Sequence, residues 1–350
     1  MLYGVRRTLA KTLYKFEGNF SYFFLKLMYS SLYTRDSRIV IVGLGNHGFT
    51  LIAFFIAVVA RHRISMVVDP SEKSKDLANK VLKCQHFSTI DEAIEAKSFF
   101  GDIIYICSDH FSHTDQANIA TKCFKSVYIE KPLFVNFDQM ASFATIQESG
   151  CNIYTGFNRP HAPFFKEFAS SLGNEFSVTM VINGHFLSED HWYRLDSQGS
   201  RVLGNLTHWL DLAVRLLSKD DLSNNVEIIL SPGYLDDLLV ILTLGSKKVS
   251  LSFSANCEPN NGVEEFIFWN STESIGSINN FRKLNYLTQN GKIRKIHTFK
   301  KDVGHQTAAL APIYGVKQDQ NIPYVSSALA LKVEDMYING VHTAEFNLDL

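Results

Sequence analysis

Between residues 36 and 157 the chain alternates short apolar runs with longer helix-like segments, and this alternation limits the folds available to it. The apolar runs are typical of buried strands and cover residues 38–42, 64–68, 103–107, 127–129 and 153–155. The helix-like segments cover residues 47–61, 72–82, 114–124 and 137–148. Strands that alternate with helices of this length predict an α/β fold with a doubly wound parallel sheet, in which the loops after the strands share one edge.

After residue 158 the pattern changes to one long helix-like segment, residues 201–217, followed by strand-like segments with turns between them. The strand-like segments are residues 226–230, 238–244, 249–255, 264–269 and 292–299. Two further helices are expected over residues 305–310 and 325–337. The pattern predicts a C-terminal α+β domain, residues 158–350, with a large and mostly antiparallel sheet. We also expect this sheet to form the contacts of a homo-oligomer.

The composition is that of a packed globular protein, with 46% hydrophobic and 20% charged residues. The formal net charge of −1 gives no reason to expect nucleic-acid binding. The five cysteines form no CxxC pattern and are odd in number. Reduced thiols in a cytoplasmic protein therefore explain them better than disulfides or a structural metal site, and we expect no metal.

Residues 1–35 form an N-terminal extension in which four basic residues precede an aromatic run over residues 20–33. The basic residues are Arg6, Arg7, Lys11 and Lys15. Lys26 interrupts the apolar run, which is too short to span a membrane and is not followed by a signal-peptide cleavage site. Two interpretations of this segment remain: an amphipathic helix that packs on the protein, which we favour, and a helix that lies on a membrane surface.

A glycine-rich loop directly follows the first predicted strand. Residues 43–48 fit G-x-G-x-x-G, and the loop residues are Gly43, Gly45, Asn46, His47 and Gly48. In a Rossmann domain, residues 36–157 here, the first glycine permits a tight turn, the second admits the pyrophosphate, and the third lets helix and strand pack closely. The start of the following helix then offers amide groups to the anion. We predict that this loop binds a dinucleotide.

Asp69 ends the second predicted strand. An acidic residue at this point accepts hydrogen bonds from the adenosine ribose and repels a 2′-phosphate. The residue favours NAD over NADP, although Lys73 lies nearby in the sequence. Asp69 could equally cap the helix that begins after Ser71, and both roles can hold together.

Three further motifs follow the later strands of the Rossmann pattern: residues 108–113 (SDHFSH), 128–133 (YIEKPL) and 155–159 (TGFNR). With the glycine loop at this spacing, the chain resembles the Gfo/Idh/MocA oxidoreductases, whose hallmark is Glu-Lys-Pro, here residues 130–132. Residues 196–211 resemble that family's catalytic helix, and residues 302–305 resemble its D-x-G-H motif. The resemblance covers about residues 36 to 345.

The resemblance implies that Lys131 and His208 are catalytic and that Ser108, His113, Glu130 and Lys131 contact the cofactor. A lysine in a partly desolvated cleft could also exchange a proton with a substrate hydroxyl on physical grounds alone. On the predicted helix, polar residues spaced three or four apart share one face: Arg201, Asn205, His208, Asp211 and Arg215. The expected substrate contacts are Asn158, Arg159, Trp192, Tyr193, Asn205 and Asp211.

The chain departs from the family pattern at three positions. Gly204 stands where many members have an aspartate, and Pro160 stands where a second arginine often follows. Asn205 replaces the glutamate of a nucleotide-sugar subgroup, and an amide cannot take a proton. Acid–base work would then fall on Lys131 and His208.

The resulting prediction is an NAD-dependent oxidoreductase that moves a hydride between nicotinamide and a carbinol of a sugar-like substrate. A nucleotide sugar of surface-polysaccharide biosynthesis is the leading candidate that the resemblance implies. Two alternatives remain: a non-catalytic regulatory protein that binds NAD, and an enzyme that cleaves glycosides with the assistance of NAD.

Overall fold

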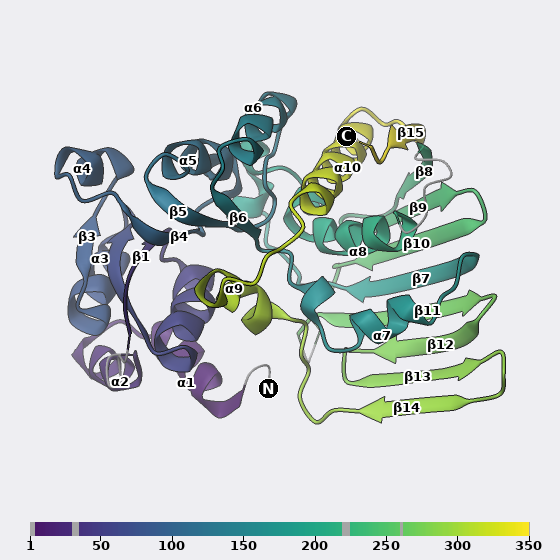
Figure 1. The fold of residues 1–350 in the computed structure, drawn as a ribbon, viewed down its shortest axis with the longest axis horizontal. Helices are drawn as coiled ribbons and strands as arrows, with labels where there is room; N and C mark the ends of the chain where they lie inside the picture. Colours follow the sequence, from purple (N-terminus) through teal and green to yellow (C-terminus); the bar gives the residue numbers. More distant parts are fainter. Residues whose placement is uncertain (1–3, 30–34, 219–224, 260–261, 350) are drawn as a thin grey trace. The chain divides into compact units, whose positions relative to one another are not determined.

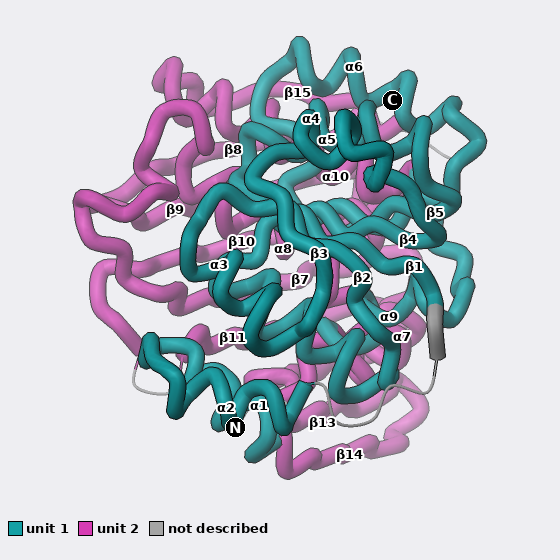
Figure 2. The backbone as a smooth tube through the Cα atoms, turned by 90° about the vertical axis from the view of Figure 1, so that its left-hand side faces the viewer, with its two compact units in different colours: residues 1–156, 305–320 teal, residues 157–304, 321–350 magenta. Residues whose placement is uncertain are grey.

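The computed structural model describes residues 4–29, 35–218, 225–259 and 262–349, which divide into two compact units. Unit 1 comprises residues 1–156 and 305–320, and unit 2 comprises residues 157–304 and 321–350 (Figure 2). We expected residues 305–320 to belong to the C-terminal domain, whereas in the structure they group with unit 1. In this segment the carbonyl oxygen of Ala309 accepts a hydrogen bond from the buried Tyr105 hydroxyl at 2.9 Å.

Unit 1 contains a parallel sheet in the order β3-β2-β1-β4-β5-β6 (Figure 1). Its strands are β1 (Arg35–Val42), β2 (His62–Val68), β3 (Gln85–Phe87), β4 (Gly101–Ile106), β5 (Phe124–Ile129) and β6 (Asn152–Thr155). Strand order reverses between β1 and β4, and the crevice at such a switch point is where open α/β sheets bind ligands. The carboxyl ends of β1 and β4 therefore mark the candidate site of this unit.

Helices and helical turns connect these strands, and they match the predicted helix-like segments with some differences in type. The predicted helix over residues 47–61 is formed mainly by two π-helical turns. The helical elements of unit 1 after β1 are η1 (Gly48–Ala53), η2 (Phe55–Val59), α3 (Glu72–Asp76), η3 (Leu77–Leu82), α4 (Ile90–Glu95), η4 (His110–Ser112), α5 (His113–Ala120), α6 (Phe137–Gln147) and α9 (His305–Tyr314).

The N-terminal extension forms two helices, α1 (Gly4–Tyr14) and α2 (Asn19–Tyr29), where we expected one. Both pack against the helical turns of unit 1. The ring of Tyr29 stacks on that of Phe49 with centroids 4.6 Å apart, and the Tyr29 hydroxyl donates to the Phe49 carbonyl oxygen at 3.0 Å. Arg7 Nε donates to the Thr50 carbonyl oxygen at 3.0 Å. The extension thus supports the helical segment that follows the glycine loop.

Unit 2 contains a nine-stranded sheet in the order β14-β13-β12-β11-β7-β10-β9-β8-β15 (Figure 1). Neighbours are antiparallel except β7 and β10, which are parallel. The strands are β7 (Phe176–Asn183), β8 (Asn225–Pro232), β9 (Leu238–Leu244), β10 (Lys247–Ser254), β11 (Glu264–Ser271), β12 (Ser274–Asn279), β13 (Lys283–Thr288), β14 (Ile293–His297) and β15 (Thr343–Asn347). Together the two sheets confirm the predicted fold class.

The helices of unit 2 carry most of the predicted substrate residues. The predicted helix over residues 201–217 is the π-helical turn η8 (Val202–Leu206) followed by α8 (Thr207–Leu217). Helix α8 packs against α10 (Asn321–Ile338). The shorter elements are η5 (Arg159–His161), α7 (Phe165–Ser170), η6 (Trp192–Arg194) and η7 (Asp196–Gln198).

Candidate functional site

The glycine loop of unit 1 has the geometry that its sequence predicts. Gly43 has a φ of +83°, and a Cβ there would lie 2.5 Å from the Ser108 backbone nitrogen. A Cβ on Gly48 would overlap the Gly43 carbonyl oxygen. Gly45 differs, because a Cβ on it would have nothing within 4 Å. Gly43 and Gly48 therefore serve local packing, whereas Gly45 lies beside open space that a ligand could approach.

Asp69 connects this loop to the end of β2. One carboxylate oxygen accepts the backbone N–H of Leu44 at 2.7 Å, and the other accepts the backbone N–H of Ser71 at 2.9 Å. The side chain cap of α3 comes from Ser71, whose Oγ accepts the backbone N–H of Ser74. Each Asp69 oxygen retains a second lone pair. Ser71 therefore caps α3 in place of Asp69, and the hydrogen bonds of Asp69 remain compatible with the predicted ribose contact.

His47 and Glu130 join the glycine loop to the end of β5. His47 Nε2 lies 2.9 Å from Glu130 Oε1, and the Tyr128 hydroxyl donates to the same oxygen at 2.9 Å. The Lys131 backbone N–H donates to the other oxygen at 3.3 Å. A side chain at Gly156 would overlap this carboxylate, so the glycine leaves room for it.

The charge of Glu130 is stabilised although the side chain is buried. Burial raises the pKa of a carboxyl group, but the charge and hydrogen bond of His47, together with Lys131 and Tyr128, outweigh burial and hold the pKa of Glu130 at about 2. Glu130 is therefore an ionised group at neutral pH. It fixes His47 beside the loop and Lys131 after β5.

The remaining predicted cofactor residues lie at the neighbouring strand ends. Ser108, after β4, donates from Oγ to Gln116 Oε1 at 2.6 Å. His113 is buried, and its Nδ1 lies 2.7 Å from the Pro132 carbonyl oxygen; burial lowers the pKa of this histidine. The Lys131–Pro132 peptide bond is cis, and the Lys131 side chain is half-buried. Asn46 is exposed in the loop.

The positions of these residues fit the binding of a dinucleotide. The helical segment after Gly45 begins at Asn46, so its first amide groups lie beside the open space at Gly45. The acidic Asp69 stands at the end of the next strand. The loop, the helix start and the acid are the three parts that bind a pyrophosphate and a ribose in this fold.

In unit 2, His208 lies in the first turn of α8 and is half-buried. Its ring lies edge-to-face with Trp209 at 6.0 Å. Asn205 lies one turn earlier, and its Oδ1 accepts a hydrogen bond from Arg201 NH1 at 2.9 Å. With Oδ1 used in this way, the amide nitrogen of Asn205 is the end that could donate to a ligand.

Asp211 does not share the half-buried position of His208. Its side chain is fully buried, and its two oxygens accept hydrogen bonds from Ser326 Oγ at 3.1 Å and Arg215 Nε at 3.0 Å. The polar residues of this helix are therefore not all available to a ligand, because Asp211 is buried inside unit 2. The contacts of Asp211 are those of a structural link between α8 and α10.

Asn158 and Arg159 are also buried within unit 2. Asn158 Nδ2 donates to the Val303 carbonyl oxygen at 2.6 Å. Arg159 Nε donates to Glu265 Oε1 at 2.6 Å, and Lys301 Nζ lies 2.7 Å from the other oxygen of Glu265. This buried triad links β11 to the loops before α7 and α9.

The triad also supports the helix that carries His208. The Arg159 guanidinium lies over the Trp209 ring, 4.1 Å from its centroid. Burial raises the pKa of Glu265, but Arg159 and Lys301 outweigh burial and the net effect lowers the pKa. Arg159 therefore packs on Trp209, the neighbour of His208, while its ion pair with Glu265 fixes the guanidinium in place.

Trp192 and Tyr193 lie in η6. The Trp192 side chain is 41% exposed, and its ring packs edge-to-face on Tyr193 with centroids 4.3 Å apart. His191 stacks on Trp192 at 6.0 Å. An exposed aromatic ring of this kind has the surface that stacking on an apolar sugar face needs, and the contact itself stays a prediction.

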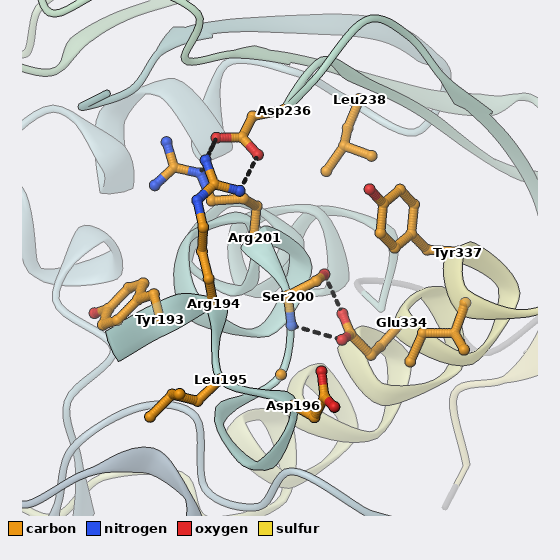
Figure 3. A pocket seen from close by; sticks show the side chains of 12 residues that line it. Tyr193, Arg194, Leu195, Asp196, Ser200, Arg201, Asp236, Leu238, Glu334 and Tyr337 are labelled. Atoms are coloured by element: carbon orange, nitrogen blue, oxygen red, sulfur yellow. Dashed lines mark hydrogen bonds and ion pairs between the residues drawn. The ribbon is translucent and has the colours of Figure 1, made fainter. Parts of the chain in front are cut away.

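Tyr193 also lines a cavity of about 380 Å³ within unit 2 (Figure 3). Two ion or hydrogen-bond pairs form its walls: Arg194 NH2 donates to Asp236 Oδ2 at 3.0 Å, and the Ser200 backbone N–H donates to Glu334 Oε1 at 2.6 Å. Burial raises the pKa of Glu334, whereas the hydrogen bonds from Ser200 lower it and only partly offset this. The remaining lining residues include Leu238 and Tyr337.

Comparison with known proteins supports the interpretation of unit 1. Residues 37–157 match the family model GFO_IDH_MocA, described as an oxidoreductase family with an NAD-binding Rossmann fold. Over these residues the chain is similar to the NAD-binding domain of the Gfo/Idh/MocA oxidoreductases. The glycine loop, Asp69 and Glu130 all fall within the matched residues.

A curated relative with a similar stretch of sequence is an uncharacterised oxidoreductase, YrbE, of Bacillus subtilis (strain 168). It is 30% identical over 74 residues, a match that spans 21% of the chain and 22% of the relative. The match thus spans only about a fifth of that protein.

Solved structures resemble about nine tenths of the chain in fold. GenD2 from gentamicin A biosynthesis, in complex with NAD, has a TM-score of 0.71 at 18% identity and covers 90% of this chain and 97% of its own. A myo-inositol dehydrogenase from Corynebacterium glutamicum ATCC 13032 has a TM-score of 0.69 at 19% identity, with 89% and 99% covered. At this identity the likeness establishes the fold, with both units in the order that the Gfo/Idh/MocA resemblance predicts.

Some contacts of the candidate site were missed from sequence. Tyr128 and Gly156 position Glu130, and both lie next to motifs that were recognised. Glu265 and Lys301 were missed because nothing near them in the sequence signals a buried pair. In the described part of the chain, no group of three or more His, Cys, Asp or Glu side chains is placed to hold a metal ion.

Proposed function

We propose that this chain is a dehydrogenase that uses NAD to oxidise, reversibly, a carbinol of a sugar-like substrate. The observation that carries the proposal is the match of residues 37–157 to an NAD-binding oxidoreductase family, over the same residues that build the open loop at Gly45 and the acid at Asp69. When bound, NAD supplies the acceptor for the hydride. Asp69 favours NAD over NADP because its charge repels a 2′-phosphate.

Lys131 and His208 are the proposed acid–base groups. As the substrate carbinol loses its hydride, one of these side chains takes the hydroxyl proton, and the same group returns the proton in the reverse direction. Glu130 positions Lys131 by accepting its backbone N–H, and the network of Arg159 and Trp209 positions the helix of His208. Placing such groups against the reacting atoms is worth up to about 7–11 kcal/mol of the barrier.

The residues proposed to contact substrate are the predicted ones whose polar or aromatic side chains are exposed or half-buried. Trp192 and Tyr193 offer stacking surface, and the Asn205 amide offers a donor. The buried Asn158, Arg159 and Asp211 are proposed to act through their neighbours rather than by touching substrate. The proposed substrate class is a nucleotide sugar, as the family resemblance suggests. Of two solved structures of this fold, one is a myo-inositol dehydrogenase and the other comes from gentamicin A biosynthesis.

A screen for turnover tests this function. The purified chain would be mixed with NAD or NADH and a panel of nucleotide sugars, free sugars and inositols, and absorbance at the nicotinamide band would be followed. We expect turnover with at least one polyhydroxylated substrate. Tight NAD binding with no turnover on any member of the panel would contradict the proposal.

A non-catalytic NAD-binding regulator is the second candidate. Asn205 favours it, because an amide stands where a subgroup of the family has a carboxylate and the amide is engaged by Arg201. Absence of turnover together with NAD-dependent binding to another macromolecule would support this candidate. Measurable turnover would exclude it.

A further inference from the structure

The outer side of α2 carries a continuous apolar stripe that no other part of the described chain covers. Phe20, Phe23, Phe24 and Leu27 follow the spacing of one helix face and are 75%, 57%, 39% and 52% exposed. The opposite side of the same helix packs into the core of unit 1 through Tyr22, Leu25 and Tyr29. A helix that is apolar on both sides is normally buried on both sides.

Helix α1 repeats this arrangement. Val5 and Leu9 are 70% and 47% exposed, and their spacing of four residues places them on one side of α1, while Phe16, just after the helix, is 63% exposed. Ala10, on another side of the helix, is fully buried. The exposed rings of α2 also contact one another, with the Phe20 and Phe24 centroids 4.8 Å apart.

The charge of this region opposes that of the whole chain. Residues 4–29 contain five basic residues and one acidic residue, whereas the chain has a formal net charge of −1. The acidic residue, Glu17, lies 3.3 Å from Lys73 Nζ and so is already paired with a cation. The exposed basic residues among the apolar ones are Arg6, Lys11, Lys15 and Lys26.

Basic residues lie next to the apolar side of α1. At about 100° per residue, Val5 and Leu9 lie about 40° apart on the helix, and Arg6 lies about 100° from Val5. Lys15 and Phe16 follow the end of the helix at Tyr14, and both are exposed. Long basic side chains at the edges of an apolar helix face can reach a charged layer while the apolar face enters a less polar one.

We propose that this N-terminal surface, formed by the exposed apolar and basic residues named above, binds the surface of a membrane that contains anionic lipids. Aromatic rings insert at the boundary between headgroups and acyl chains, and basic side chains meet anionic headgroups. A lipid surface accepts an irregular aromatic patch without a shaped complementary groove, and its negative charge matches the excess of basic residues.

The binding is peripheral. No helix in the described residues has the length and apolarity to cross a bilayer. Each of the two helices has 11 residues, about half of what a span requires. The extension also lies outside the residues that match the oxidoreductase family. The proposed membrane binding therefore does not depend on the proposed reaction, and it would hold the enzyme at a membrane surface.

Flotation of the full chain with lipid vesicles tests the proposal. Vesicles would consist of phosphatidylcholine alone or of equal parts phosphatidylcholine and phosphatidylglycerol. We expect the chain to float with the anionic vesicles, to be released at high salt, and to stay unbound with neutral vesicles. The variants Phe20→Ser/Phe23→Ser and Lys11→Glu/Lys15→Glu should each weaken the partition by about tenfold or more.

The matched controls are Phe299→Ser and Lys295→Glu, which change an exposed aromatic and an exposed basic residue of unit 2. They should float as the unchanged chain does. NAD binding, measured on every variant, shows that unit 1 is folded. Equal flotation of all variants, or failure of the unchanged chain to bind anionic vesicles, overturns the proposal. So does a result in which the N-terminal variants alter only the oligomeric state, because the surface would then be a contact between copies of the chain.

Discussion

His47 Nε2 lies 2.9 Å from Glu130 Oε1 although the two residues are 83 positions apart in the sequence. One belongs to the glycine loop after β1 and the other to the Glu-Lys-Pro motif after β5. The pair therefore ties the proposed phosphate-binding loop to the segment that carries the proposed catalytic lysine. Each of these segments was recognised separately from sequence, and the pair is what joins them.

The pKa of Glu130 gives the first prediction. Its folded value of about 2 lies below the ordinary 4.5, so its ionised form stabilises the fold above about pH 4.5, and this stabilisation is lost as the pH falls toward 2. The shift corresponds to about 3 kcal/mol. Glu130→Gln should thus be less stable than the unchanged chain at neutral pH, and the difference in the free energy of unfolding should shrink on acidification. Urea titrations across this range measure it.

Glu334 provides a comparison of opposite sign. Burial raises its pKa, so any stabilisation by the protonated form is present below its ordinary pKa and is lost as the pH rises through the folded value. Glu334→Gln should therefore gain relative to the unchanged chain as the pH rises. A parallel pH dependence for the Glu130 and Glu334 variants would contradict the assignment of either shift.

The second prediction separates two glycines of the loop. Gly48→Ala should destabilise unit 1 because the new Cβ would overlap the Gly43 carbonyl oxygen. Gly45→Ala should leave thermal stability nearly unchanged, because its Cβ would meet nothing within 4 Å, yet it should weaken NAD binding by obstructing the pyrophosphate. Thermal unfolding and NADH fluorescence titration on both variants decide this. Unaltered NADH affinity in folded Gly45→Ala would count against the proposed cofactor site.

The third prediction concerns cofactor choice. Removing the charge of Asp69 by substitution with Asn should reduce the preference for NADH over NADPH by about tenfold, mainly by improving NADPH binding. The Asn side chain keeps an oxygen that can accept the Leu44 or Ser71 backbone N–H. Glu72→Gln, an exposed acidic residue three positions away, is the control. Titration of both cofactors is the measurement, and tighter NADPH than NADH binding by the unchanged chain would refute the role of Asp69.

The parts of the site that could be predicted from sequence are those whose residues are close together in the chain. The glycine loop and Asp69 were identified because a strand, a turn and a helix start follow one another directly. Arg159 and Asp211 were expected to contact substrate, whereas the structure buries both against partners more than 100 residues away, Glu265 and Ser326. Polarity on a predicted helix does not reveal whether a distant residue pairs with it.

Strand β7 shows a different kind of omission. Phe176, Val178, Met180 and Ile182 alternate with more exposed residues, which is a strand signal, but no strand was predicted there. The strand lies between β11 and β10 in the second sheet, with which it pairs over eight residues each. Its parallel pairing with β10 depends on chain crossovers that no local pattern encodes.

The fourth prediction tests the buried triad of Arg159, Glu265 and Lys301. Replacing Arg159 with Met leaves Glu265 with one cation and should lower the free energy of unfolding by about 3–5 kcal/mol. Arg294→Met is a matched control, because Arg294 forms a comparable 2.9 Å pair with Glu167 at the surface. An exposed pair of this type contributes up to about 1 kcal/mol. If Arg159→Met were as stable as the control and only raised KM, Arg159 would be a substrate contact after all.

The fifth prediction concerns the proposed acid–base groups, Lys131 and His208. Lys131→Ala and His208→Ala should each lower kcat by about 10²–10⁴-fold, the usual contribution of a general acid or base. His208→Ala should leave NADH affinity unchanged, because no cofactor contact is proposed for it. The double variant should lose much less than the product of the two single losses, since groups that serve one proton transfer act as a unit.

The conservative variants Lys131→Arg and His208→Gln separate chemistry from positioning. Both retain a hydrogen-bond donor, but neither can exchange a proton near neutral pH, so they should be nearly as slow as the alanine variants while keeping KM close to that of the unchanged chain. Recovery of kcat by either substitution would assign that residue to positioning alone. Full activity in a single alanine variant would remove the residue from the mechanism, and multiplicative losses in the double variant would show that the two side chains act in different steps.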